Sequence, residues 1–390
     1  MFAWLLIVAT GVCLAQQLIA TILIAALTAP KSNVRRVGAT LLLPFGCCQA
    51  YLIYYLFPWV FAQALVQALL PGTCFVQFHY LLFNPAADAT VPPCFMKLSW
   101  TAWVRIFVQV IRDSRGVPSP ASPTRNTDAT LNRAAFFRQR FAQYARNALI
   151  PEVMWFLGRR EFGVSTPEWD HVLSPGTEYL LLRLTFRQLQ ARIVATAGVW
   201  IMVYCTVDTF DCLILTAAVA LGDNRPEDWQ PMFGSLRDAF SLRGFWGKFW
   251  HRLIRRPLID FSTALLRLVS VNRGKRCDIA FLCIVFVLSG LVHVPMDIAF
   301  WAMTGAPSFP LFLIFCKTMV AILLETIVVR YYRGYRRRRG RSAEWTWTVE
   351  RALGYIWVFL FLCYASPPAF YPVLRVLGSE NHWSLYWPIP

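Results

Sequence analysis

Long apolar runs divide this chain, and they restrict its fold more than any other feature does. A helix crosses a bilayer in about 20 residues, so runs of this length predict membrane spans. Only 15% of the residues are charged, against about a quarter in a typical soluble domain. We therefore predict an all-α polytopic membrane protein with about six to eight transmembrane helices. The predicted spans are Phe2–Pro30, Gly38–Leu56, Phe57–Phe83, Ile193–Gly222, Ile279–Thr304, Ser308–Val329 and Ala352–Val373.

The positions of the basic residues predict how these spans are oriented. Phe2–Pro30 lacks a basic start and a clear cleavage site, so we expect a retained first helix. Lys31, Arg35 and Arg36 follow it and place that end in the cytosol by the positive-inside rule. The net charge is +17, and one run contains no acid: Arg330, Arg333, Arg336 to Arg339 and Arg341. We expect this run to serve topology and to attract anionic lipid, and we expect no nucleic-acid partner.

We expect a single integral-membrane domain over residues 1–390. Within it, 97–190 is a basic amphipathic cytosolic region with an irregular loop at Val117–Thr130, and 226–328 contains the motifs described below. Ile193–Gly222 would be about 45 Å long as one helix, well over a hydrocarbon core of about 30 Å. Asp208 and Asp211 lie in its middle. We therefore predict a break near Asp208 that makes two short or re-entrant limbs.

The cysteines and histidines do not predict a metal site. Eight of the 11 cysteines lie in apolar runs, where a thiol packs as a small hydrophobic group, and no CxxC pair occurs. We therefore expect no bound metal and no metal-dependent chemistry.

The segment Phe286–Asp297 places one imidazole, His293, inside an apolar run. An ionisable group inside a membrane is costly and is a candidate for function. Ser289, His293 and Asp297 are spaced four apart and share a helix face, and Pro295 should kink the helix beside the imidazole. We expect His293 to act as a general base toward an acceptor hydroxyl. The alternatives are a hydrogen-bonded core histidine, or a triad with Ser289 as nucleophile, whose geometry one helix face rarely provides.

The segment Ser241–Pro257 has the pattern of an amphipathic helix. On a helical wheel one side holds the cations, and the other holds aromatic and aliphatic groups. The cations are Lys248, Arg252, Arg255 and Arg256, and the apolar residues include Trp246 and Trp250. Such a helix either lies on anionic headgroups or binds the phosphates of an anionic donor such as coenzyme A. His251 falls between the two faces, as an interface histidine or as a second catalytic or substrate-orienting group.

One acid, Glu325, lies inside the run Met319–Val329. Lys317 is two helical turns away and too far for a direct pair, so Glu325 needs a partner from a neighbouring helix or a place in the cavity wall. We favour a structural role.

These segments together resemble the membrane-bound O-acyltransferase family, in its wax-synthase-like branch. Three blocks occur in the family's order: Pro226–Pro257, Phe286–Asp297 and Ile322–Val328. Trp229, Pro231 and Phe233 match a W-x-P-x-F approach, and the segments SLR, FWG and WH follow it. The form FWGxxWH is similar to that of fungal secondary-metabolite O-acetyltransferases.

The resemblance implies acyl transfer from acyl-CoA to an alcohol, with acetyl-CoA as cosubstrate and no bound cofactor. It implies that His293 is the catalytic histidine and that His251 occupies a second site position, which some branches fill with asparagine. With the residue patterns, it implies donor phosphates near Lys248, Arg252, Arg255 and Arg256. The resemblance also implies a catalytic cavity inside the helix bundle. The residues expected to line this substrate cavity are Ser289, Asp297, Glu325, Trp246 and Trp250.

We therefore expect an endoplasmic-reticulum enzyme that acetylates a terpenoid or meroterpenoid hydroxyl and contacts acyl-CoA, a lipophilic alcohol and membrane lipid. Within this class, the alternative is a long-chain wax or sterol ester synthase. From another class, a proton-coupled transporter would use His293, Asp208, Asp211 and Glu325 as a relay. A non-catalytic scaffold would leave the intramembrane histidine unexplained.

Overall fold

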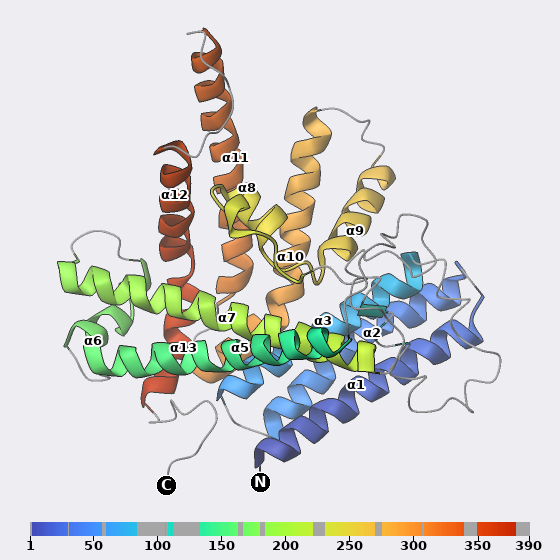
Figure 1. Ribbon diagram of the computed structural model, residues 1–390. Helices are drawn as coiled ribbons and strands as arrows, with labels where there is room; N and C mark the ends of the chain where they lie inside the picture. The colour runs from blue at the N-terminus through green and yellow to red at the C-terminus, as the bar shows by residue number, and fades with distance from the viewer. Residues whose placement is uncertain are drawn as a thin grey trace.

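The structure is a computed structural model, and it describes residues 2–29, 31–56, 60–83, 106, 108, 110–111, 133–162, 167–179, 184–220, 231–269, 275–305, 308–338 and 349–379. Regular structure in these residues is helical throughout (Figure 1). The α-helices are α1 (Phe2–Leu27), α2 (Asn33–Leu56), α3 (Val60–Phe83), α5 (Arg133–Phe162), α6 (Pro167–Leu173), α7 (Phe186–Ala220), α8 (Leu242–Gly244), α9 (Arg255–Leu268), α10 (Lys275–Thr304), α11 (Pro310–Arg338), α12 (Val349–Ala365) and α13 (Pro367–Ser379). Shorter turns are η3 (Thr177–Tyr179), η5 (Leu236–Asp238) and the π-helical η6 (Phe245–Phe249).

The described helices confirm an all-α polytopic membrane protein. Five of them are long and apolar enough to cross a bilayer: α1, α2, α7, α10 and α11. A sixth span is possible if α12 and α13, which meet at a bend of 53°, count as one. The apolar part of α3, Leu69–Phe83, is shorter than a full span. The described residues therefore reach only the lower end of the predicted six to eight.

Buried amide and hydroxyl side chains hold α1, α2 and α3 together. Gln17 on α1 donates from Nε2 to Gln49 Oε1 at 2.7 Å, and it accepts from Thr73 Oγ1 at 2.6 Å. Thr21 Oγ1 donates to Gln77 Oε1 at 2.9 Å. Since lipid offers no hydrogen bonds, these side chains satisfy one another between the helices. The unit positions α3 against α9 and α10, which form part of the site.

The predicted break near Asp208 is wrong, because α7 is one helix of 35 residues. It runs beside α5, and both lie crosswise to α10 and α11 (Figure 1). The carboxylate of Asp208 accepts from three α5 residues, Gln143 Nε2 at 2.7 Å, Arg146 Nη2 at 2.7 Å and Asn147 Nδ2 at 2.8 Å. A buried carboxylate satisfied in this way needs no break in its own helix. Of the predicted basic region 97–190, the loop Val117–Thr130 lies outside the described residues.

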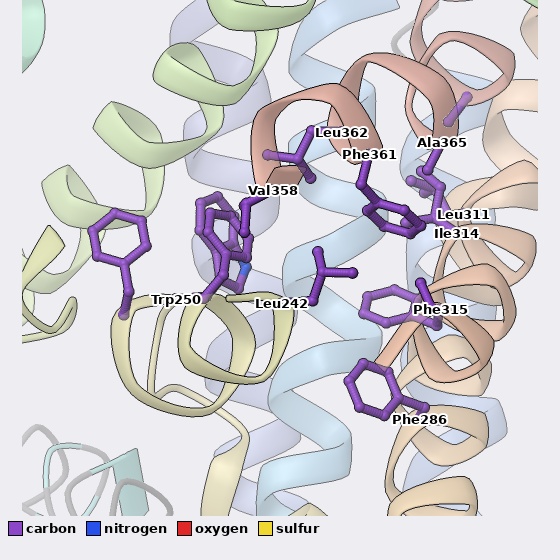
Figure 2. Packing of buried hydrophobic residues seen from close by; sticks show 14 of the residues in the cluster. Leu242, Trp250, Phe286, Leu311, Ile314, Phe315, Val358, Phe361, Leu362 and Ala365 are labelled. Atoms are coloured by element: carbon purple, nitrogen blue, oxygen red, sulfur yellow. The ribbon is translucent and has the colours of Figure 1, made fainter. Parts of the chain in front are cut away.

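The helices α10 and α11 form a close antiparallel pair. They border the main aromatic and aliphatic core together with the α8–η6 segment, α12 and α13 (Figure 2). Gly290 allows this approach, because a Cβ there would lie 2.8 Å from Cδ2 of Phe312. The turn between them is held by Asp297, whose carboxylate accepts from the first amides of α11. α10 continues through Pro295 to Thr304. This pairing places His293 directly against α11.

Candidate active site

A cavity of about 1180 Å³ lies between the α8–η6 segment, the start of α9, and the facing parts of α10 and α11. Its lining on α10 runs from Asp278 to His293, and its lining on α11 runs from Arg333 to Phe315. Fifteen residues of α-helix separate the two ends on α10, which is about 22 Å at 1.5 Å per residue. The cavity is therefore a deep cleft with charged groups near one end and an imidazole at the other.

The wall from 241 to 257 is not the single amphipathic helix that the sequence predicted. The short α8 and η6 end at Trp250, whose backbone is extended at ψ 157°, and α9 begins only at Arg255. Backbone bonds to the preceding segment replace helix bonds, from Gly234 N to Phe249 O at 2.8 Å and from Arg252 N to Met232 O at 3.0 Å. A Cβ on Gly234 would lie 2.0 Å from a backbone oxygen, so only glycine permits this pairing. Trp229 of the matching motif lies outside the described residues.

Glu325 secures the turn that starts this wall. Its Oε2 accepts from the Leu242 amide at 2.7 Å and from Trp357 Nε1 at 3.0 Å. Ser241 Oγ accepts from the Gly244 amide at 2.9 Å, which satisfies a second amide of the same turn. Glu325 also lines the cavity. The acid therefore has the structural role that the sequence favoured, and its donors are backbone and indole N–H groups rather than a cation.

His293 is oriented by its own helix. Its Nδ1 lies 2.7 Å from the carbonyl oxygen of Ser289. A carbonyl oxygen only accepts, so Nδ1 carries the hydrogen, and in the neutral ring Nε2 holds the lone pair. The ring packs on Phe315, with centroids 4.7 Å apart. Among the described residues no hydrogen bond occupies Nε2, which leaves this nitrogen available to a substrate proton.

His251 lines the same cavity as a second, neutral imidazole. Burial, followed by the nearby His293, lowers its pKa from 6.5 to about 3. Its Nδ1 is buried and has no hydrogen-bond partner in the described part of the chain. The ring is held between Trp250 and Phe233, at centroid distances of 5.5 Å and 6.3 Å. A neutral ring can donate or accept one hydrogen bond toward a substrate, but it does not supply a positive charge.

Asp297 does not line the cavity, contrary to the prediction. It is 0% exposed and accepts from Leu311 N at 2.8 Å and Phe312 N at 3.0 Å. Ser289 does line the cavity, as do Trp246 and Trp250. The three helix-face residues therefore form no Ser–His–Asp relay, since the nitrogen that a triad would direct to a carboxylate is bound to a backbone carbonyl instead.

The predicted donor-binding cations separate into two groups. Lys248 and Arg255 line the cavity, whereas Arg252 and Arg256 do not. Arg256 Nε lies 3.6 Å from Asp260 Oδ2, and that carboxylate also contacts His79 Nε2 at 2.8 Å. Because the segment is not one helix, the helical wheel grouped side chains that the fold directs apart.

The sequence analysis missed three cavity cations: Arg243, Arg330 and Arg333. A signal for two of them was present, because Ile322, Thr326, Arg330 and Arg333 recur at helical spacing and share one face of α11. The first part of the arginine run thus belongs to the cavity. Arg336 instead pairs with Glu350 at 2.5 Å and fastens α11 to α12.

Of the residues proposed for a proton relay, His293 and Glu325 line the same cavity, whereas Asp208 and Asp211 do not line it. Asp208 is bound to α5 and lies outside the cavity lining, and Glu325 is bound to α8 and α12. Within the described ranges no group of three or more His, Cys, Asp or Glu side chains is placed to hold a metal.

Comparison with known proteins finds a matching family profile and several similar chains. Residues 229–316 match the profile of the membrane bound O-acyl transferase family. The chain is similar to acetyltransferase nanB of Aspergillus nanangensis (33% identity, covering 49% of this chain and 46% of the relative). It is similar to acetyltransferase TRI7 of Fusarium sporotrichioides (31%, covering 56% and 51%) and to acetyltransferase ataH of Aspergillus terreus (30%, covering 64% and 81%). The chain thus spans about half the length of the first two relatives and most of the third.

Proposed function

This chain belongs to the membrane bound O-acyl transferase family, and from that premise we propose that it transfers an acetyl group from acetyl-CoA to a hydroxyl of a lipophilic metabolite. The observation that carries the proposal is His293, held by Ser289 at the inner end of a deep cavity with Nε2 left for a proton. The relatives are named acetyltransferases, which supports acetyl as the transferred group. We place the enzyme in the membrane of the endoplasmic reticulum.

We propose that the charged end of the cavity receives the donor's phosphates. Lys248 and Arg255 approach from one wall, and Arg243, Arg330 and Arg333 add to them. Among the acids nearby, Glu325 is occupied by N–H donors, and Asp238 lies 3.8 Å from Lys248. Charge-assisted bonds to phosphate favour arginine, and the extended pantetheine arm would then carry the thioester inward.

The proposed reaction takes place at the inner end. His293 Nε2 accepts the hydroxyl proton while the alcohol oxygen attacks the thioester carbonyl carbon. The C–S bond breaks, and the imidazolium returns the proton to the leaving thiolate, so the products are the ester and CoA. The neutral His251 orients the substrates by a hydrogen bond. A positioned base contributes about 10²–10⁴-fold in rate.

We propose that the acceptor enters along the apolar wall that α9 and α10 share. Leu258, Leu282 and Val285 line this wall, and Ile259 and Ile279 line it while remaining exposed on the outside of the molecule. An apolar surface that continues from lipid into a cavity suits a flat, hydrocarbon-rich alcohol. Terpenoid or meroterpenoid alcohols are the class we propose.

The test is CoA release by membranes that contain the protein, with acetyl-CoA and palmitoyl-CoA offered separately and a mixed pool of terpenoid and long-chain alcohols as acceptors. We expect acceptor-dependent release from acetyl-CoA that falls about 10²–10⁴-fold in His293→Ala. The matched control is His171→Ala, an exposed histidine on α6 away from the cavity. Release from palmitoyl-CoA alone would assign a wax or sterol ester synthase. Full turnover in folded His293→Ala would refute the proposed base.

A further inference from the structure

The cavity ends at the same level on both of its long helices. On α10 the last lining residue is His293, and on α11 the first is Phe315. Their rings pack together at 4.7 Å between centroids. In the described part of the chain, no residue of either helix lines the cavity beyond this contact toward the turn that joins them. Phe315 and the imidazole therefore form the inner end of the cavity.

The space behind Phe315 is filled by side chains. Phe315 is 6% exposed, and the core around it includes Leu311, Ile314 and Phe361 (Figure 2). Trp246 closes the side of the same end, with its ring 5.4 Å from that of Phe315. Protein cores are packed like organic crystals, so this region has no spare volume for a flexible chain.

From this packing we propose that Phe315 limits the acyl group of the donor to a few carbons, a specificity inference that rests on the proposed acyl transfer. The thioester carbonyl must lie beside the hydroxyl whose proton His293 accepts, within a hydrogen-bond length of about 2.6–3.2 Å for that proton transfer. The acyl tail therefore starts at the closed end. An acetyl group adds one methyl beyond the carbonyl, whereas each further methylene meets the wall that Phe315 and Trp246 form.

The size of the expected selectivity follows from pocket chemistry. One methylene changes discrimination in a hydrophobic pocket by roughly 10- to 200-fold. Two extra methylenes, as in butyryl-CoA, should therefore lower kcat/KM by well over tenfold relative to acetyl-CoA. Shortening the side chain at 315 should relax this ratio without removing the base.

The experiment compares kcat/KM for acetyl-, butyryl-, hexanoyl- and palmitoyl-CoA in the native chain, Phe315→Leu and Phe315→Ala. The matched control is Phe361→Leu, which removes the same volume from the same core but does not line the cavity. We expect the acetyl-to-butyryl ratio to fall at least tenfold in a folded Phe315 variant and to stay constant in Phe361→Leu. The conservative leucine keeps the test valid if the alanine variant does not fold.

Three results would overturn the inference. An unchanged ratio in a folded Phe315→Leu would show that another element sets the chain length. Equal use of palmitoyl-CoA and acetyl-CoA by the native protein would show that the acyl tail follows the apolar wall instead, with acyl transfer itself intact. An absence of turnover with every donor in the native protein would remove the proposed function, and this specificity with it.

Discussion

Substituting Asp297 tests whether this residue, which shares a helix face with His293, has a structural or a chemical role. Its carboxylate is fully buried and accepts from Leu311 N at 2.8 Å and Phe312 N at 3.0 Å. The first amides of a helix have no partner within it, so Asp297→Ala leaves two of them unsatisfied. Each buried orphan costs about 1–3 kcal/mol, which gives roughly 2–6 kcal/mol of destabilisation in total. Asp297→Asn keeps one accepting oxygen and should cost about half of this.

The assay is thermal unfolding of the detergent-solubilised protein, together with turnover per folded molecule. We expect the unfolding midpoint to fall in the order native, Asp297→Asn, Asp297→Ala, while folded molecules keep most of their turnover. The control is Asp170→Ala, an exposed aspartate on α6. If Asp297→Ala unfolded at the same temperature as the native protein but had lost its turnover, this reasoning would be refuted and the acid would have a chemical role.

Three further predictions follow from the cavity walls. Gly234→Ala places a Cβ 2.0 Å from a backbone oxygen, so turnover should fall more than tenfold in expressed protein, as measured by CoA release. Removing the charges of Arg330 and Arg333 with glutamine should raise KM for acetyl-CoA about 10- to 100-fold but leave KM for acetyl-pantetheine, which lacks the nucleotide phosphates, unchanged. His251 has a folded pKa of about 3 against 6.5 ordinarily, so the unfolded state binds its proton first as pH falls. The thermal unfolding midpoint should therefore fall as the pH is lowered from 6.5 toward 3, and it should fall less steeply in His251→Asn. Above pH 6.5 this group should make no contribution to the pH dependence.

The glycine and arginine predictions each have a matched control. Gly11→Ala adds a Cβ with no atom within 4 Å and should leave turnover unchanged. Arg267→Gln with Arg338→Gln removes two exposed charges outside the cavity and should leave both KM values unchanged. Equal effects of the two arginine pairs would mean that the charges act on the membrane rather than on the donor.

The membrane class and the main helix pair were predictable from the sequence, because span length and the absence of charge are local properties. The shared face of Ser289 and His293 follows from helical periodicity in the same way. The count of spans was less predictable. α7 has the composition of a span, yet it lies beside α5 and crosswise to α10 and α11 (Figure 1). Three α5 side chains satisfy Asp208, so α7 needs no break.

The details of the site depended on long-range backbone pairing, which periodicity does not report. The residues after Ser241 have the pattern of one amphipathic helix, but bonds to Met232 and Gly234 hold part of this segment extended. That pairing separates Lys248 and Arg255, at the cavity, from Arg252 and Arg256. Asp297 has helix-face spacing with His293, but the start of α11 competes for its carboxylate and binds it.

The most direct test of the account is the pH dependence of kcat/KM for acetyl transfer by the native protein and by His293→Gln. Nε2 of His293 can accept the hydroxyl proton only while it holds its lone pair, so protonation of this ring should stop the reaction. We predict that the native rate falls with acid as Nε2 becomes protonated, and that the small residual rate of His293→Gln does not change with pH. If kcat/KM of His293→Gln fell with acid in the same way as that of the native protein, at comparable turnover, the assignment of His293 as the base would be contradicted.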